Sequence, residues 1–311
     1  MQGLLDRHGI PPADDLPAIS GVVVEVAWSD LQPSPEGAIV SGNAIDRTLA
    51  TVRALNADRP AHPLAIKLRI DGGIHAPAWA KSLGGAPITV TDPTDGVTGT
   101  VGRFWSEGYG RAYANLESLL AARYDSVPEI REVTMSRCTT VYDEPFIRDR
   151  NDRTTVAALL AAGFTQAADV QCLSEQIDAH AVWRSTRSGL ALSPYQRIDP
   201  AGSGDGVQVT APLMDLCRSR LGARCVLENN SLRNPPQGGD YTPMYALIQR
   251  LGAPISFQTA APAKLGGLET VIGIAAGMGA SAVELPQGYG GLTPGRLAAL
   301  GTQLVAPAAQ G

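Results

Sequence analysis

The sequence predicts an α/β fold, and its length suits a (β/α)8 barrel. Short apolar runs alternate with longer helical stretches, which is the pattern of a parallel sheet built from βα units. The chain has 311 residues, an ordinary length for one such barrel. Linkers, internal repeats and low-complexity tracts are not seen in the sequence. We therefore expect residues 1–311 to form a single barrel domain.

Seven of the eight strands can be placed on apolar runs. The missing strand should be the first, where residues 2–5 offer a short candidate, so we expect it to be short or irregular. The seven predicted strands are residues 21–27, 64–70, 130–135, 189–192, 224–227, 254–257 and 282–285.

The helices are predicted between these strands, with Asn43 as the cap of the first. The segment 84–102 is rich in Gly, Thr and Pro and is predicted to be a long loop after a strand. Loops of this kind build the active face of a barrel. The predicted helices are residues 44–55, 104–123, 153–162, 214–221, 242–251, 267–278 and 294–305.

Composition excludes several classes of protein. A chain with 44% hydrophobic and 18% charged residues is globular, with a sizeable core. The net charge of -5 argues against nucleic acid as a partner. No run approaches the roughly 18 apolar residues that a membrane-spanning helix needs. The four histidines are scattered and no Cys-x-x-Cys pair exists, so we expect no metal site and no cofactor.

The four cysteines indicate whether the protein folds in an oxidising compartment. Cys217 is predicted on a helix and Cys225 at the start of the next strand, so a short turn could bring them into bridging range. The even count and this placement favour Cys217–Cys225 and Cys138–Cys172 bridges, and with them a secreted or extracytoplasmic protein. Four buried thiols are the alternative. Residues 1–9 lack the apolar core of a signal peptide.

The first half of the chain resembles a known clan of enzymes. A strand that ends in Trp28 and a Pro-x-x-Gly turn lead to a helix that opens near Ile-Asp, and the following strand leads to Ala-Pro-x-Trp at Trp79. This order resembles the (β/α)8 glycosidases that include cellulase-like and β-galactosidase-like families. The segments that carry the resemblance are GVVVEVAWSDLQPSPEG, AIDRTLATVRAL, LAIKLRIDGGIHAPAW and FWSEGYGRAYANLESLLAARYDSVPEIREVTMS.

The resemblance implies hydrolysis of a carbohydrate at the carboxyl ends of the strands. In that clan the acid is a Glu after strand four, usually written Asn-Glu, and the nucleophile is a Glu after strand seven. Here strand four ends in Ser-Arg-Cys, and the nearest acids are Asp143 and Glu144. Gln258 stands where the nucleophile is expected, and an amide cannot act as a carboxylate nucleophile.

Strand alternation selects the carboxylates that point into the barrel. We predict Glu144 as the acid, the alternative being a loop carboxylate that caps a helix. Glu284 is the first choice for the second carboxylate, unless it is a buried anchor paired to Arg69. Glu228 is the next choice, and Glu25 is interpreted as a structural charge paired to Lys67 or Arg69. Two carboxylates are the minimum for acid/base cleavage of a glycoside.

Aromatic and polar residues near the predicted strand ends are candidates for sugar binding. Rings stack on sugar faces, although each of these rings could equally belong to the core. His75 could bind a hydroxyl group or could be an ordinary loop residue, and Trp183 is interpreted as core. The predicted sugar-binding residues are Trp28, Asp71, His75, Trp79, Trp105, Tyr142, Asn229, Asn230, Gln258 and Tyr289.

Three functions remain open at this point. The first is a glycoside hydrolase that acts on an oligo- or polysaccharide through two carboxylates. The second is a carbohydrate-binding barrel that has lost its chemistry, as Gln258 could indicate. The third, a lyase or phosphate-binding isomerase, would need a phosphate loop after the last strands, and residues 287–295 match such a loop only weakly.

Overall fold

The computed structural model contains a closed eight-stranded parallel barrel and describes residues 1–35 and 37–304. The barrel order is β1-β10-β9-β8-β7-β6-β3-β2, so β1 pairs with both β10 and β2 and closes the sheet. This confirms the predicted α/β barrel. The first strand is short, as expected, and lies at Gly3–Asp6.

The other strands follow the predicted apolar runs. The largest difference is the strand that begins at Cys225, which continues to Leu232, five residues beyond the predicted end. The barrel strands are β1 (Gly3–Asp6), β2 (Gly21–Ala27), β3 (Ala65–Asp71), β6 (Ile130–Thr134), β7 (Arg187–Ala191), β8 (Cys225–Leu232), β9 (Ile255–Thr259) and β10 (Ala282–Leu285).

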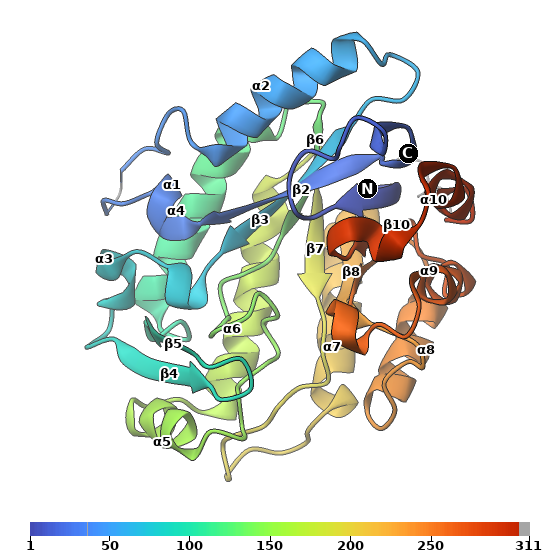
Figure 1. Ribbon diagram of the computed structural model, residues 1–311. Helices are drawn as coiled ribbons and strands as arrows, with labels where there is room; N and C mark the ends of the chain where they lie inside the picture. The colour runs from blue at the N-terminus through green and yellow to red at the C-terminus, as the bar shows by residue number, and fades with distance from the viewer. Residues whose placement is uncertain (36, 305–311) are drawn as a thin grey trace.

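Helices surround the barrel (Figure 1). Asn43 caps the first long helix through its side chain, as predicted. The helix predicted to end at residue 305 ends at Gly301, and Val305 lies outside the described residues. The helices are α1 (Trp28–Leu31), α2 (Ala44–Ala57), α3 (Ala78–Lys81), α4 (Glu107–Tyr124), α5 (Arg153–Ala161), α6 (Gln166–Ala179), α7 (Val207–Leu221), α8 (Tyr241–Leu251), α9 (Leu268–Gly277) and α10 (Pro294–Gly301).

Two expectations for the middle of the chain were wrong. The segment 84–102 is not only a loop, because β4 (Ile88–Asp92) and β5 (Val97–Val101) form an antiparallel hairpin that packs against α5 (Figure 1). The helix α6 was not predicted, because its buried face includes polar residues such as Gln166, Asp169 and Gln176. Trp183 follows this region outside a helix and is fully buried, as expected for core.

The alternation of side chains along the strands is as predicted. Lys67 on β3 contacts carboxylates from β6, β8 and β10, which can meet only in the interior of the barrel. Apolar partners of the same strands, such as Ile66, Phe257 and Val283, are fully buried in the main core. The interior of the barrel is therefore charged, and the hydrophobic core lies between the barrel and its helices.

Both predicted disulfides are present. Cys217 on α7 is bonded to Cys225 at the start of β8, and Cys138 after β6 is bonded to Cys172 on α6. Among the described residues, no single helix is long and apolar enough to cross a membrane, although one bent pair, 153–161 with 166–182, would pass on length and composition.

Candidate active site

A cavity of about 580 Å³ opens at the carboxyl ends of the barrel strands. Its walls come from the ends of β1, β2, β3, β8 and β9 and from the segments that follow β6, β7 and β8. Five carboxylates line it: Glu25, Asp71, Asp95, Asp143 and Glu144. The location is the one at which (β/α)8 barrels place their chemistry.

Asp71 and Asp143 form a carboxyl pair in the wall of this cavity. Asp71 is the last residue of β3, and its side chain is hydrogen-bonded to that of Asp143. Burial, together with the charge and hydrogen bond of Asp143, raises the pKa of Asp71 to about 9. Asp71 is therefore mainly protonated at neutral pH.

Two glycines allow this close approach. Gly72 and Gly73 follow Asp71, and a Cβ atom on either would collide with the backbone oxygen of Ser136 or Thr140. Gly73 also has a φ of +50°, which favours glycine. The Ile74 amide then donates to the Thr140 carbonyl at 3.0 Å. The segment after β3 is thereby held against the segment after β6.

Glu144 is half-buried in the cavity wall. Burial, followed by the negative charge of Asp143, raises the pKa of Glu144 to about 7. A carboxyl group with this pKa is partly protonated at neutral pH and can donate its proton to a leaving group. Among the carboxylates predicted from sequence to be catalytic, Glu144 is the one that lines the cavity.

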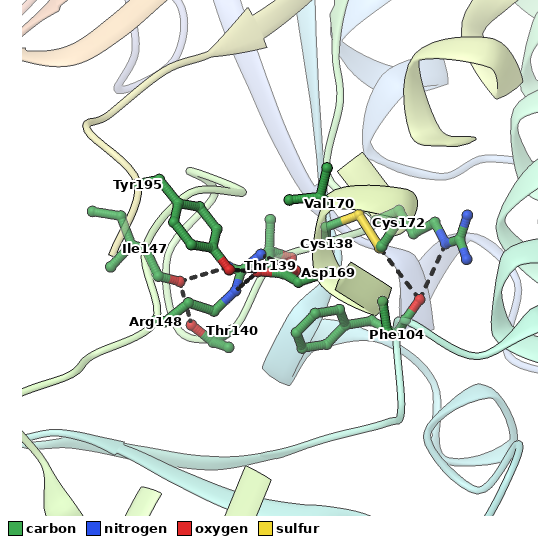
Figure 2. Close-up of polar contacts among 12 residues, drawn as sticks. Phe104, Cys138, Thr139, Thr140, Ile147, Arg148, Asp169, Val170, Cys172 and Tyr195 are labelled. Carbon is green, nitrogen blue, oxygen red and sulfur yellow. Dashed lines mark hydrogen bonds and ion pairs between the residues drawn. A yellow bond between two sulfur atoms is a disulfide. The ribbon is translucent and has the colours of Figure 1, made fainter. Parts of the chain in front are cut away.

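Three contacts with α6 fix the segment that carries Asp143 and Glu144. Cys138 is bonded to Cys172, and Arg137 Nη1 donates to Glu175 at 2.7 Å. Beyond Glu144, the fully buried Arg148 donates to both carboxylate oxygens of Asp169, at 2.8 and 2.6 Å. Figure 2 shows the disulfide and the Arg148–Asp169 pair in one view.

The Arg148–Asp169 pair has a third member. Tyr195, after β7, donates its hydroxyl to Asp169 at 2.8 Å, and Arg148 also donates to the Ile147 carbonyl at 2.7 Å (Figure 2). A buried bidentate pair with its remaining atoms satisfied is a rigid support. The segment after β6 is therefore anchored to α6 at both ends, which positions Glu144 before any ligand arrives.

Glu228 and Glu284 face the barrel interior, as predicted, but lie below the cavity. Lys67 Nζ is 2.7 Å from Glu228, 2.9 Å from Glu284 and 3.0 Å from Glu132, and all four side chains are at most 1% exposed. Glu284 also pairs with Arg69 at 2.8 Å. Both carboxylates are thus held as members of an interior charge network.

The network sets the protonation of its members. Burial, with the charges of Glu132 and Glu284, raises the pKa of Glu228 to about 8 in spite of Lys67. Burial alone would raise the pKa of Glu284, but Arg69 and Lys67 hold it below its usual value. At neutral pH, Glu228 is therefore mainly protonated and Glu284 ionised.

Arg69 links this network to the cavity. Its Nη1 is 2.6 Å from Glu25, its Nη2 is 2.8 Å from Glu284, and its Nε is 3.7 Å from Asp143. Glu25 was interpreted from sequence as a charge paired to Lys67 or Arg69, and the Arg69 pair is present. The side chain of Glu25 is nonetheless 46% exposed and lines the cavity, so it is accessible to a ligand.

The aromatic candidates divide between the core and the cavity. Trp28 is fully buried and packs edge-on against Trp79, Tyr109 and Tyr113, outside the barrel. Trp105 packs against Phe104 and Phe164 instead. Tyr289 is buried and donates its hydroxyl to Asp6.

Of the aromatic residues predicted to bind sugar, Tyr142 is the one in the cavity wall among the described residues. Its hydroxyl donates to Asp95 at 2.9 Å.

The polar candidates divide in the same way. Asp71, His75, Asn230 and Gln258 line the cavity, and the amide oxygen of Gln258 is buried without a hydrogen-bond partner among the described residues. Asn229 does not line it, because its amide donates to the Leu192 carbonyl at 2.7 Å and its oxygen accepts from Tyr245 at 2.9 Å.

Several residues that line the cavity were not predicted from sequence. They lie in loops or at strand ends without a motif, so no sequence pattern distinguishes them from ordinary surface residues. These further lining residues include Arg7, Arg69, Asp95, Asp143, Ser193, Ser231, Arg233, Gln237, Tyr241 and Lys264.

Comparison with solved structures finds sugar-cleaving enzymes with the same architecture. The catalytic domain of the β-amylase from Paenibacillus polymyxa has a TM-score of 0.57 at 12% identity, covering 97% of this chain and 97% of that one. The two structures share the closed α/β barrel fold. A β-galactosidase from a Rahnella species has a TM-score of 0.56 at 15% identity, covering 97% of this chain and 56% of that one.

An endo-β-1,4-glucanase from Bacillus licheniformis, solved with cellotetraose, has a TM-score of 0.54 at 12% identity and covers 98% of this chain and 60% of that one. This chain therefore spans nearly all of the amylase domain but little more than half of the galactosidase and the glucanase. No protein-family model matches it, and comparison with curated proteins gives no match.

This barrel differs at two strand ends from the pattern that the sequence resemblance implied. β6 is followed by Ser136, Arg137 and Cys138 instead of Asn-Glu, and β9 carries Gln258 instead of Glu. The carboxylates that line its cavity come from β2, β3, the β4–β5 turn and the segment after β6. Any acid/base chemistry in the cavity must be assigned from those groups.

Proposed function

We propose that the protein is a glycoside hydrolase that cleaves an oligo- or polysaccharide, with Glu144 as the acid that protonates the leaving group. The observation that supports this proposal most directly is a carboxyl group with a pKa of about 7 in the wall of the cavity. A pKa near the working pH gives the most effective general acid. The two disulfides suit a secreted enzyme.

We assign the second carboxylate to Glu25. It lines the same cavity, is accessible, and is oriented by Arg69 at 2.6 Å. Glu284 and Glu228 were the earlier candidates, but Lys67 holds them below the cavity. The Asp71–Asp143 pair, in which Asp71 is mainly protonated, lines the same cavity and is suited to binding sugar hydroxyls.

We further propose that cleavage inverts the anomeric configuration. Gln258 on β9 cannot form a glycosyl-enzyme intermediate. An inverting enzyme needs only an acid and a base that activates water on the opposite side of the sugar. In this mechanism Glu144 gives its proton to the glycosidic oxygen, Glu25 takes a proton from water, and the water oxygen forms the new bond to the anomeric carbon as the old bond breaks.

The test is turnover of the Glu144→Gln and Glu25→Gln variants on natural glycans and on aryl glycosides with a good leaving group. Glu144→Gln should lower turnover of natural glycans by about 100- to 10,000-fold and matter much less for the activated substrate. Glu25→Gln should lower turnover of both the natural glycan and the activated aryl glycoside. Glu269→Gln, a change on the exposed surface, is the control.

The first-formed anomer, followed by nuclear magnetic resonance, separates inversion from retention. Unchanged turnover of Glu144→Gln on a natural glycan would remove it from the mechanism. Glycan binding by the wild type without any hydrolysis would favour the binding barrel instead.

A further inference from the structure

Three cationic side chains that line the cavity have no carboxylate partner among residues 1–35 and 37–304. Arg7 follows β1, Arg233 follows β8 and Lys264 follows β9. Arg7 donates to the Thr259 carbonyl at 3.5 Å, and none of the three takes part in an ion pair among the described residues. Arg69 differs, because it is paired with both Glu25 and Glu284.

The barrel order places these cations after strands of one half of the barrel, and of the three Arg7 lies near enough to Glu284, Glu25 and Glu144 to interact with their charges. β8, β9, β10 and β1 are consecutive around the barrel, and the three cations follow strands of this half. β6, β3 and β2 are consecutive on the other side and bring Glu144, Asp143, Asp71 and Glu25. The cavity thus has one cationic wall and one acidic wall, with Lys264 at its rim, where a smaller cavity lined by Asp92, Asp95 and Asp149 begins.

We propose that the cavity binds a carbohydrate that carries carboxylate or sulfate groups, which lie against Arg7, Arg233 and Lys264. Arginine forms paired, charge-assisted hydrogen bonds with such planar or multi-oxygen anions. Arg7 and Arg233 are half-buried, Lys264 is exposed, and an anionic substituent supplies the ion-pair partner that the three lack. The acidic wall repels the same groups, so the ligand can take only one orientation.

In that orientation the bound carbohydrate can be cleaved by the proposed acid and base, and this part of the inference rests on the proposed function. The anionic substituents lie on the side of β8, β9 and β1, and an adjacent glycosidic oxygen then faces Glu144 and Glu25. A neutral sugar would leave the three cations without compensation. We therefore expect charge on the substrate to decide affinity.

Titration calorimetry with the folded protein and its Glu144→Gln variant tests the inference by binding alone. The probes are a tetrameric oligogalacturonate, a sulfated carrageenan tetrasaccharide and cellotetraose. We expect at least one charged probe to bind about tenfold or more tightly than cellotetraose. The charged probe that binds identifies carboxylate or sulfate as the group recognised. Weaker binding at higher salt is expected for that probe.

Two arginine variants locate the binding group. Arg233→Gln should weaken binding of the charged probe about tenfold or more and leave cellotetraose unchanged. Arg250→Gln, which makes the same charge change at an exposed site on α8 outside the cavity, should change neither. Equal losses in the two variants would overturn the inference, as would failure of both charged probes to bind more tightly than cellotetraose.

The outcome is separable from that of the proposed function. Hydrolysis of neutral glycans that depends on Glu144, without any preference for charged probes, would overturn this inference and leave the proposed function intact. Tight binding of a charged probe that depends on Arg233, without hydrolysis of any glycan, would support this inference and overturn the proposed function.

Discussion

Replacing Lys67 with methionine removes the cation that three buried carboxylates share. Lys67 Nζ lies 2.7–3.0 Å from Glu228, Glu284 and Glu132, and water does not reach any of them. Removing one partner of a buried ion pair costs about 3–5 kcal/mol, because the remaining charge is left uncompensated. With an unfolding entropy of about 2.1 cal/mol/K per residue, this corresponds to a melting temperature lower by about 5–8 °C.

The loss should depend on pH with a defined sign. Without Lys67, the folded-state pKa of Glu228 rises further above its unfolded value, and the pKa values of Glu284 and Glu132 rise from below theirs. The folded protein then holds protons that the unfolded chain releases, so stability falls as pH rises from the unfolded pKa of about 4.5 through the raised folded values. Thermal and urea unfolding, followed by circular dichroism, should therefore show a larger deficit at pH 8 than at pH 5.

Glu228→Gln is the matched control for this experiment. The pKa of Glu228 is about 8, so the side chain is mainly neutral at pH 7 and glutamine has nearly the same shape and charge. We expect its stability to change by less than about 1 kcal/mol at that pH. A Lys67→Met variant within about 1 kcal/mol of the wild type at pH 8, or an equal deficit at both pH values, would refute the reasoning.

Three further predictions concern the site and its supports. The wild-type kcat/KM should fall as pH rises through about 7, where Glu144 loses its proton, and Glu144→Gln should lack this alkaline limb in a pH–rate profile. Replacing Cys138 and Cys172 by alanine should lower the free energy of unfolding by about 4 kcal/mol in a guanidinium titration. The same change at Cys217 and Cys225 should lower it by about 2.5 kcal/mol, because that disulfide closes a shorter loop. Trp28→Ala should lower the free energy of unfolding by about 3–5 kcal/mol in the same titration, because Trp28 packs in the core. It should leave KM for a glycan unchanged. A raised KM in the fully folded variant would show that Trp28 contacts the sugar.

The barrel was predictable because strand alternation is a strong signal. Lys67 and Arg69 interrupt an apolar run at every second position, and such residues must share one face of a strand. Alternation gives the side that a residue faces but not its depth along the barrel axis. Glu228 and Glu284 therefore point inward as predicted, yet neither lines the cavity.

The helix α6 was missed for a related reason. Its buried residues include Asp169, which pairs with Arg148, and Gln176, whose oxygen accepts from the Cys138 amide at 3.4 Å. These contacts place polar residues on the inner face of the helix and remove the apolar stripe that sequence analysis uses. The cationic wall escaped prediction because single arginines and lysines after strands have no pattern.

The β4–β5 hairpin has an evolutionary consequence. Its two strands pair with each other and with no barrel strand among the described residues, while Asp95 in its turn reaches the cavity and accepts from Tyr142. Insertions or deletions at its tip would leave barrel closure untouched, since longer loops cost little free energy. Selection could therefore reshape this wall for new substrates while the strands that hold Glu25, Asp71 and Arg69 stay constant.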